Sequence, residues 1–292
     1  MASILITGGT GYLGSHLVKD CIAGGHRVAI LKRRASPLVR LHGYESRISM
    51  FDLDQGGLGD ALRADGGVDA IIHTATAYGR RGENWREVFA TNTDLPLRVL
   101  SAAIDQGVKL FINTDTVLDP FVNPYALSKT QFREWGQLLA RDGATCFVNL
   151  RLEHFFGPKD DPTKFTTHVI RSCIENRPRL ELTVGEQIRD FIYIDDVVSA
   201  YRAVLDKHLF ACSGYLHYDV GSGVAVSIRS FVETIHRLST STTILDFGAV
   251  PYRENEAMYS QADTAALRSL GWMCVTMLDD GIRKTIEGES VS

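Results

Sequence analysis

The feature that most constrains the fold of this chain is a short apolar run that leads directly into glycines and then into an amphipathic stretch. The run Ile4-Leu5-Ile6 is followed by T-G-G-T-G-Y-L-G at residues 7–14. In such a loop Gly8 allows a tight turn, Gly11 lets the backbone approach a pyrophosphate, and Gly14 permits close packing of a helix on a strand. The N-terminus of that helix would offer unpaired N–H groups to the anion. We therefore predict a dinucleotide-binding loop made of Gly8, Thr10, Gly11, Tyr12, Leu13 and Gly14.

Strand patterns and helix patterns alternate along the first half of the chain. Short β-branched runs without polar alternation suit strands that are buried on both faces of a parallel sheet. Amphipathic stretches separate most of these runs, as in a doubly wound sheet. The sequence therefore predicts an α/β protein with a Rossmann-type doubly wound parallel sheet. The predicted strands are residues 3–7, 27–31, 48–51, 70–73, 109–113 and 146–150.

The regular alternation ends near Arg151. Beyond it, prolines at positions 158, 162 and 178 interrupt short elements. We predict a cofactor-binding Rossmann domain over residues 1–151 that includes the reaction residues. A smaller, mixed α/β lobe over residues 152–292 would then bind substrate. Segments within 189–220, namely 191–194 and 215–220, are expected to return as strands to the main sheet.

Composition excludes several classes of protein. Of the 292 residues, 45% are hydrophobic and 23% are charged, and the formal net charge is −4. These values are typical of soluble globular proteins and favour neither a nucleic-acid nor a membrane partner. No apolar run approaches the roughly 20 residues of a membrane span. The odd number of cysteines, without a C-x-x-C pair, predicts neither a disulfide framework nor a metal site, and suggests a cytoplasmic location. They are Cys21, Cys146, Cys173, Cys212 and Cys274.

The end of the second predicted strand discriminates between cofactors. Residues 31–34 are L-K-R-R and include no acidic residue. A carboxylate there would bind the ribose 2′-hydroxyl of NAD, whereas a nearby arginine accommodates the 2′-phosphate of NADP. A basic loop tip that only faces solvent is the alternative. We favour NADP(H), with Lys32, Arg33 and Arg34 at its 2′-phosphate.

A tyrosine and a lysine lie four residues apart on one face of a predicted helix. They are Tyr125 and Lys129 in the segment Y-A-L-S-K. A tyrosine of pKa near 10 exchanges protons poorly at neutral pH unless a nearby ammonium stabilises its phenolate. Such a pair suits hydride chemistry, in which Tyr125 would exchange a proton with a carbonyl or alcohol oxygen. The spacing is common by chance, but its position after the glycine loop makes it specific.

Together these motifs resemble the extended short-chain dehydrogenase/reductases, in the NAD-dependent epimerase/dehydratase family. Asp52-Leu53 and Asn92 match that family, and R-D-F-I-Y-I-D-D-V-V at 189–198 points to its nucleotide-sugar branch. The resemblance covers nearly the whole chain. Residues 113–116, 151–158 and 182–187 look like the abequose and paratose synthases. That group uses NADPH to reduce the 4-keto group of CDP-4-keto-3,6-dideoxyglucose, which supplies dideoxysugars for O-antigen.

The resemblance implies roles at individual positions. Arg189 resembles an arginine that binds the diphosphate of the sugar nucleotide, and Arg253 is a candidate second contact. The alternative for Arg189 is an ion pair with Asp190 or Asp195. Homodimers that pair helices are common in the family. The implied cofactor contacts are Asp52 and Leu53 at the adenine, Thr74, Ala75 and Thr76 at the phosphates and ribose, Asn92, and Lys129 at the nicotinamide ribose.

The chain departs from the family at two further places. Where the family usually has a serine-rich motif, this chain has Thr114-Asp115-Thr116. Counting forward from Val108-Lys109 puts Thr116 in the position of the catalytic hydroxyl, whereas counting from the valine after the motif favours Thr114. We favour Thr116. Both threonines would lie on one face of their strand, with Asp115 opposite. Glu153 and His154 stand where phenylalanine-asparagine is more usual. They are expected to contact substrate, and a structural histidine is the alternative for His154.

Three enzyme functions share this scaffold. A 4,6-dehydratase would need an Asp-Glu pair after its threonine, which the chain lacks. A 4-epimerase would retain NAD, in conflict with the basic strand end. The third is an NADPH-dependent reductase of a nucleotide-linked 4-keto-6-deoxysugar, in the narrower form a CDP-linked 3,6-dideoxysugar. It fits both the basic segment at residues 32–34 and the resemblance to the abequose and paratose synthases. A non-catalytic NADP(H)-binding sensor protein is the alternative outside enzymes, although Tyr125 and Lys129 are intact.

Overall fold

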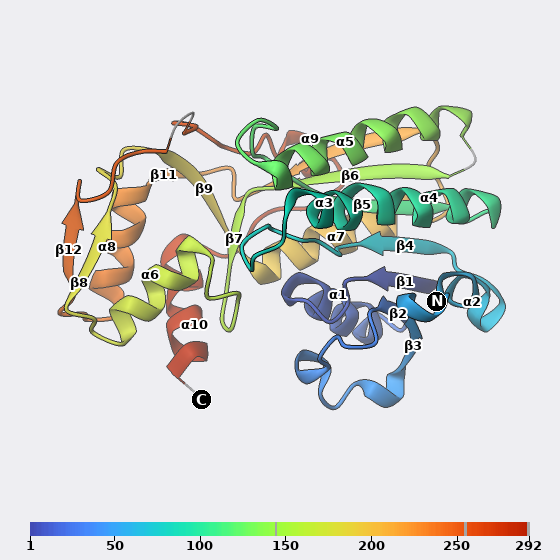
Figure 1. Ribbon diagram of the computed structural model, residues 1–292, viewed down its shortest axis with the longest axis horizontal. Helices are drawn as coiled ribbons and strands as arrows, with labels where there is room; N and C mark the ends of the chain where they lie inside the picture. Colours follow the sequence, from blue (N-terminus) through green and yellow to red (C-terminus); the bar gives the residue numbers. More distant parts are fainter. Residues whose placement is uncertain (144, 254–255, 291–292) are drawn as a thin grey trace. The chain divides into compact units, whose positions relative to one another are not determined.

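The computed structural model describes residues 1–143, 145–253 and 256–290, and these form two compact units. The first unit contains Met1–Arg151 and Val198–Tyr218, and the second contains Leu152–Val197 and the residues from Asp219 onward. The chain therefore leaves the first unit after the sixth strand, returns to it through a helix and one more strand, and leaves it again (Figure 1).

A seven-stranded sheet forms the centre of the first unit, in the order β10-β6-β5-β4-β1-β2-β3. Neighbours from β3 to β5 pair in parallel, with Ile6 beside Ile30 on one side and beside Ile72 on the other. This order is that of a doubly wound Rossmann sheet, so the predicted fold class is confirmed. The strands are β1 (Ser3–Thr7), β2 (Arg27–Lys32), β3 (Ile48–Asp52), β4 (Ala70–His73), β5 (Leu110–Thr116), β6 (Cys146–Leu152) and β10 (Tyr215–Val220).

Helices connect these strands because each crossover between parallel strands needs an intervening element. α4 and α5 lie side by side (Figure 1), and α5 also packs on α3. A short π-helical turn, Ala90–Asp94, joins α3 to α4. The helices of this unit are α1 (Tyr12–Ala23), α2 (Leu58–Arg63), α3 (Trp85–Phe89), α4 (Leu95–Asp105), α5 (Pro124–Leu139) and most of α7 (Ile194–His208).

The core of this unit forms where the sheet meets α2, α4 and α5. Phe111 of β5 and Phe147 of β6 stack with their ring centroids 5.5 Å apart, and Phe132 of α5 packs edge-on against both rings. All three side chains have no exposed surface. Fully burying an aromatic side chain of this size stabilises a fold by about 2–3 kcal/mol, and this cluster fixes α5 on the strands that bear the candidate site.

The second unit contains two small sheets with helices packed beside them. In the first sheet β9 pairs in parallel with β7 and antiparallel with β11, and in the second sheet β8 pairs with β12. Of the two segments expected to rejoin the main sheet, residues 215–220 do so as β10, whereas 191–194 lie in β9 and the start of α7. The elements are β7 (His154–Phe156), α6 (Phe165–Ile174), β8 (Arg179–Leu182), β9 (Ile188–Tyr193), β11 (Ala225–Ser227), α8 (Ile228–Leu238), β12 (Ile244–Phe247), α9 (Ala265–Ser269) and α10 (Leu278–Ser290).

One expectation about the cysteines is wrong. Cys146 at the start of β6 and Cys212 after α7 form a disulfide, with their Cα atoms 5.7 Å apart. The two residues lie 66 positions apart in the sequence, and they meet because β10, which follows Cys212, pairs beside β6. Spacing along the chain gives no indication of that pairing. Cys21, Cys173 and Cys274 are free thiols.

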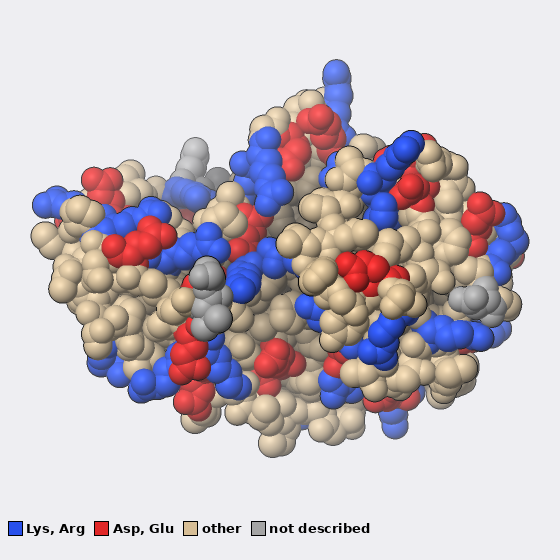
Figure 2. All heavy atoms as spheres, turned by 90° about the horizontal axis from the view of Figure 1, so that it is seen from below, with Lys and Arg blue, Asp and Glu red and all other residues tan. Residues whose placement is uncertain are grey.

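The helices and the surface charge can be compared with what composition predicts. None of the helices described is both long enough and apolar enough to span a membrane. On the face shown in Figure 2, basic and acidic side chains are interspersed.

Candidate functional site

The glycine loop between β1 and α1 has no room for side chains at two positions. Gly8 has a φ of +70°, and a Cβ added there would lie 2.5 Å from the backbone nitrogen of Ala75. A Cβ on Gly14 would lie 2.2 Å from the carbonyl oxygen of Gly8. The Gly11 N–H donates to that same carbonyl at 2.9 Å and so closes the turn.

The N-terminus of α1 is open to an anion. Its N-cap is Gly11, which has no capping side chain, and its first turn contains no acidic residue. The first N–H groups of a helix have no partner within the helix, so those after Gly11 point out of it. Leu13 is buried and offers only backbone here, whereas Thr10 and Tyr12 are half-buried. The loop therefore fits the pyrophosphate of a dinucleotide.

The segment after β4 lies against this loop. The Thr74 hydroxyl donates to the Thr7 carbonyl at 2.8 Å, and Ala75 abuts Gly8. Asn92 is fully buried, accepts from the Ala77 N–H at 2.8 Å and from the Thr76 hydroxyl, and donates to Ser128 of α5 at 3.0 Å. Asn92 also donates to the Ala77 carbonyl, so its amide is fully engaged. It ties the segment after β4 to the helix that bears Tyr125 and Lys129.

The basic end of β2 is divided between a buried and an exposed part. Lys32 forms an ion pair with Asp52 at 2.7 Å, and the two side chains are only 11% and 27% exposed. The parallel register of β2 and β3 places these residues opposite each other. Arg33 and Arg34 are exposed, and Leu53 begins the short turn after Asp52. Of the three basic residues at this strand end, the two arginines are therefore the exposed ones. Sequence reasoning missed Arg40, whose guanidinium lies over the ring of Tyr12 at 5.2 Å.

The end of β5 and the start of α5 bring the reaction residues together. Asn123 caps α5 by accepting the Ala126 N–H at 2.9 Å, which fixes Tyr125 in the first turn. The side chain of Thr116 lies close enough to the Tyr125 hydroxyl to lower its pKa. Thr114 lies two residues earlier on the same strand, and its hydroxyl is 2.6 Å from that of Tyr201 on α7. Thr116 is thus beside Tyr125, and Thr114 is beside Tyr201.

Burial moves the pKa values of the tyrosine and the lysine in opposite directions. The pKa of Tyr125 is raised, first because removal from water destabilises its phenolate and next because of Tyr78; the hydrogen bond with Thr116 acts in the opposite direction. The ring centroid of Tyr78 lies 4.9 Å from that of Tyr125. Burial lowers the pKa of Lys129 to about 8, and Asp115 opposes that shift. For Tyr125 the loss of hydration therefore outweighs the interactions that favour its phenolate.

Asp115 lies on the face of β5 opposite the two threonines. It is buried and accepts hydrogen bonds from Arg133 and from Asn149, each at 3.0 Å. Its other oxygen accepts the N–H of Thr116 at 2.8 Å. Its carboxylate also acts electrostatically on Tyr125 and on Lys129. It fixes the backbone of Thr116 as well.

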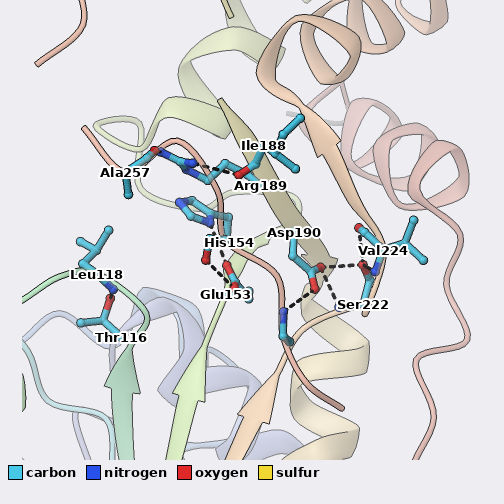
Figure 3. Close-up of polar contacts among 12 residues, drawn as sticks. Thr116, Leu118, Glu153, His154, Ile188, Arg189, Asp190, Ser222, Val224 and Ala257 are labelled. Carbon is cyan, nitrogen blue, oxygen red and sulfur yellow. Dashed lines mark hydrogen bonds and ion pairs between the residues drawn. The ribbon is translucent and has the colours of Figure 1, made fainter. Parts of the chain in front are cut away.

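In the second unit Glu153 and His154 lie where β6 gives way to β7. Glu153 is buried and accepts from the Ser260 hydroxyl at 2.6 Å. Its second oxygen is 3.3 Å from Nδ1 of His154. The imidazole of His154 is about one-third exposed, with its ring tilted against Phe191. The pair is shown in Figure 3.

Arg189 on β9 is buried, and Glu256 is its ionic partner at 2.8 Å, not Asp190 or Asp195. Asp190 instead accepts from Ser222 and from the Gly223 N–H (Figure 3). Arg253 is exposed. Tyr78, Tyr201 and Glu256 were missed by sequence reasoning, because only the fold brings residues from distant segments beside Tyr125, Thr114 and Arg189.

Comparison with known proteins shows the family to which this chain belongs. The sequence model of the NAD dependent epimerase/dehydratase family matches residues 4–221. CDP-abequose synthase of Salmonella muenchen is 31% identical over 97% of this chain and 96% of its own length. CDP-abequose synthase of Salmonella typhimurium (strain LT2) is 32% identical over 92% of each chain. The predicted resemblance to abequose synthases is confirmed.

Solved structures share the fold. MoeE5 in complex with UDP-glucose and NAD has a TM-score of 0.84 at 24% identity, covering 99% of this chain and 100% of its own. UDP-glucuronic acid 4-epimerase from Bacillus cereus, in complex with UDP-glucuronic acid and NAD, has a TM-score of 0.85 at 21% identity, with 99% of each chain covered. The matched family model, the near-full-length relatives and the sheet order agree, and the chain belongs to the NAD dependent epimerase/dehydratase family, with the fold of the extended short-chain dehydrogenase/reductases.

Proposed function

We propose that this chain is an NADPH-dependent reductase of the 4-keto group of a nucleotide-linked 4-keto-6-deoxysugar, in the narrower form a CDP-linked 3,6-dideoxysugar. The observation that supports it most is the placement of Tyr125, with Lys129 one helical turn later on α5, beside Thr116 at the end of β5. A tyrosine hydroxyl in that position can donate the proton that reduction of a ketone needs. The relatives named CDP-abequose synthase support the sugar class.

The chemistry is a two-electron reduction in which the residues of the chain manage the proton. NADPH, when bound, supplies the hydride that adds to C4. Tyr125 donates its hydroxyl proton to the carbonyl oxygen, which becomes the alcohol. Thr116 hydrogen-bonds the negative charge that develops on that oxygen, and Lys129 offsets the charge left on the tyrosine and holds the nicotinamide ribose.

The cofactor contacts in this proposal follow the geometry of the first unit. The loop of Gly8, Gly11 and Gly14 and the N-terminus of α1 bind the pyrophosphate. Arg33 and Arg34 bind the 2′-phosphate, while Lys32 stays paired with Asp52. Further contacts come from Thr10, Tyr12, the backbone of Leu13, Asp52, Leu53, Thr74, Ala75 and Thr76.

Substrate contacts come from the second unit. Arg189, with Arg253 as a second cation, binds the diphosphate, because a guanidinium fork matches phosphate oxygens. Glu153 and His154 face the sugar nucleotide. A 4-epimerase is the second candidate, since the solved structures with this fold include 4-epimerases in complex with NAD. A threonine, Thr116, follows Asp115 where a dehydratase needs an Asp-Glu pair, which disfavours a dehydratase.

The deciding experiment mixes purified protein, NADPH and CDP-4-keto-3,6-dideoxyglucose and follows the nicotinamide absorbance. Stoichiometric oxidation of NADPH, slower with NADH, is the expected result. No net oxidation, together with NAD retained in the purified protein, would replace the reductase with the epimerase.

Replacing Tyr125 with phenylalanine removes the proton donor and keeps the ring. We expect turnover to fall by about 10²–10⁴-fold while NADPH binding, measured by fluorescence titration, survives. Tyr44→Phe, in the same unit, is the matched control and should leave turnover unchanged. Turnover of Tyr125→Phe at the wild-type level would refute the assignment of the proton donor.

The cofactor preference depends on two exposed arginines. Arg33→Ala combined with Arg34→Ala should weaken NADPH binding by about 10–100-fold, because charged hydrogen bonds to the 2′-phosphate are lost. NADH has no such phosphate, so its affinity should barely change. Arg98→Ala, on the exposed side of α4, controls for net charge. Equal weakening of both cofactors would contradict the phosphate assignment.

A further inference from the structure

The guanidinium of Arg189 is held by three acceptors of two kinds. One terminal nitrogen donates to the Ile188 carbonyl at 2.9 Å. The other donates to the Ala257 carbonyl and to the Glu256 carboxylate, the latter at 2.8 Å. The two carbonyl bonds can be followed in Figure 3. Of these acceptors only Glu256 brings a negative charge, so among the described residues it is the ionic partner of the buried cation.

The carboxylate is the more exposed group of the pair. The side chain of Arg189 is 7% exposed and that of Glu256 is 25% exposed. Glu256 is therefore the member of the pair that solvent reaches more readily. The main-chain carbonyls of Ile188 and Ala257 would keep the plane of the guanidinium fixed if the carboxylate left, because their bonds do not depend on it.

We propose that Glu256 is a specificity-determining carboxylate that occupies the anion position on Arg189 and is displaced by the diphosphate of the substrate. This inference rests on the proposed function, in which Arg189 binds that diphosphate. A buried guanidinium without a counter-charge is costly, so Glu256 stabilises the ligand-free protein. On binding, the phosphate oxygens replace the carboxylate and keep the cation neutralised.

The exchange sets a minimum charge for the ligand. A neutral sugar cannot replace Glu256, because it would leave the guanidinium without a counter-charge. A diphosphate brings more negative charge than one carboxylate and offers several oxygens to the planar fork. Glu256 therefore selects nucleoside diphosphates over uncharged sugars, and it lowers the affinity for every anion by the free energy of its own bond.

The test measures binding of CDP and of inorganic pyrophosphate by calorimetry, in the presence of NADPH. Glu256→Gln keeps the shape and one acceptor oxygen but removes the competing charge. We expect it to bind both probes about tenfold more tightly than wild type, because the charged hydrogen bond that competes with the probe is weakened. Glu181→Gln, at an exposed position of β8, removes the same charge elsewhere and should change neither affinity.

A double variant separates this inference from the proposed function. Arg189→Met combined with Glu256→Gln removes both charges, so no buried charge is left unpaired, and thermal unfolding checks that it folds. Loss of CDP binding in the double variant, with tighter binding in Glu256→Gln, supports the displaced carboxylate. Unchanged or weaker binding in Glu256→Gln overturns it while Arg189 keeps its role. Wild-type binding in the double variant overturns both.

Discussion

Lys129 is an ammonium group with almost no contact with water, and this conflict between burial and charge has a cost in stability. Its side chain is 2% exposed, and no hydrogen bond or ion pair of Lys129 is formed among the residues that the structure describes. A structural lysine would be expected to have a partner. A buried ammonium with Asp115 as an electrostatic neighbour suits the proposed function, in which Lys129 holds the ribose of the cofactor.

We expect Lys129→Met to stabilise the protein at neutral pH while abolishing turnover. The pKa of Lys129 falls from its usual 10.5 to about 8, chiefly through burial. Between these values the unfolded chain binds more protons than the native one, so native stability rises with pH across that window. Below pH 8 the charged lysine costs up to about 3 kcal/mol, which methionine removes.

Urea unfolding at several pH values checks this prediction. The stability advantage of Lys129→Met should be largest at pH 7 and should shrink as the pH rises from about 8 to 10.5. Lys109→Met, at an exposed position, should change stability by less than about 0.5 kcal/mol. A Lys129→Met variant that is less stable than wild type at pH 7 would show that the lysine is not strained.

The sequence predicted which side chains come together where those side chains are close along the chain. Tyr125 and Lys129 lie on one helix, and their spacing alone placed them together. Lys32 and Arg189 could not be interpreted in this way. Their partners, Asp52 and Glu256, lie 20 and 67 positions away and are brought close only by strand pairing and by a long loop. Partners of this kind decide which charges remain available to a ligand.

At the scale of elements, the glycine loop and the strands of the first unit follow from local pattern. Apolar runs between glycines become parallel strands because both faces of the sheet are covered, and this needs no knowledge of distant residues. The sheet that a later strand joins does not follow from local pattern. Residues 188–193 and 215–220 have similar apolar patterns, yet β9 joins the small sheet and β10 joins the large one. The choice depends on which edge is free, and a single segment does not contain that information.

Gly14→Ala should disrupt the connection between β1 and α1. The new Cβ would lie 2.2 Å from the Gly8 carbonyl oxygen, a backbone atom that cannot move without opening the turn. We expect a loss of about 1–3 kcal/mol in unfolding free energy and at least tenfold weaker NADPH binding. Thermal unfolding and fluorescence titration measure the two effects.

Gly59→Ala on α2 is the matched control for this substitution. Its Cβ would meet only the flexible end of Arg63, at 3.2 Å. Alanine favours a helix over glycine by up to about 1 kcal/mol, so this variant should be as stable as wild type or more stable. If Gly14→Ala and Gly59→Ala have the same effect on stability and on NADPH binding, the close approach of the loop to α1 is not the reason for a glycine at position 14.

At the scale of the whole molecule, an uncovered apolar surface remains on the first unit. Trp85 and Phe89 of α3 are 63% and 45% exposed, and Trp135 and Leu138 of α5 are 47% and 46% exposed. The spacing of each pair places it on one side of its helix, and the two helices pack against each other. Exposed large apolar side chains on neighbouring helices are typical of protein–protein interfaces.

We expect this surface to join two copies of the chain in solution. A twofold dimer places the same patch on both subunits, so each substitution acts twice. Trp135→Glu with Leu138→Glu would bury four unpaired carboxylates in such an interface, which should convert a dimer into a monomer in size-exclusion chromatography with light scattering. Phe210→Glu, at an exposed site in the turn after α7, should leave the mass unchanged. A wild-type protein that is already monomeric at micromolar concentration would show that these aromatic side chains face solvent for another reason.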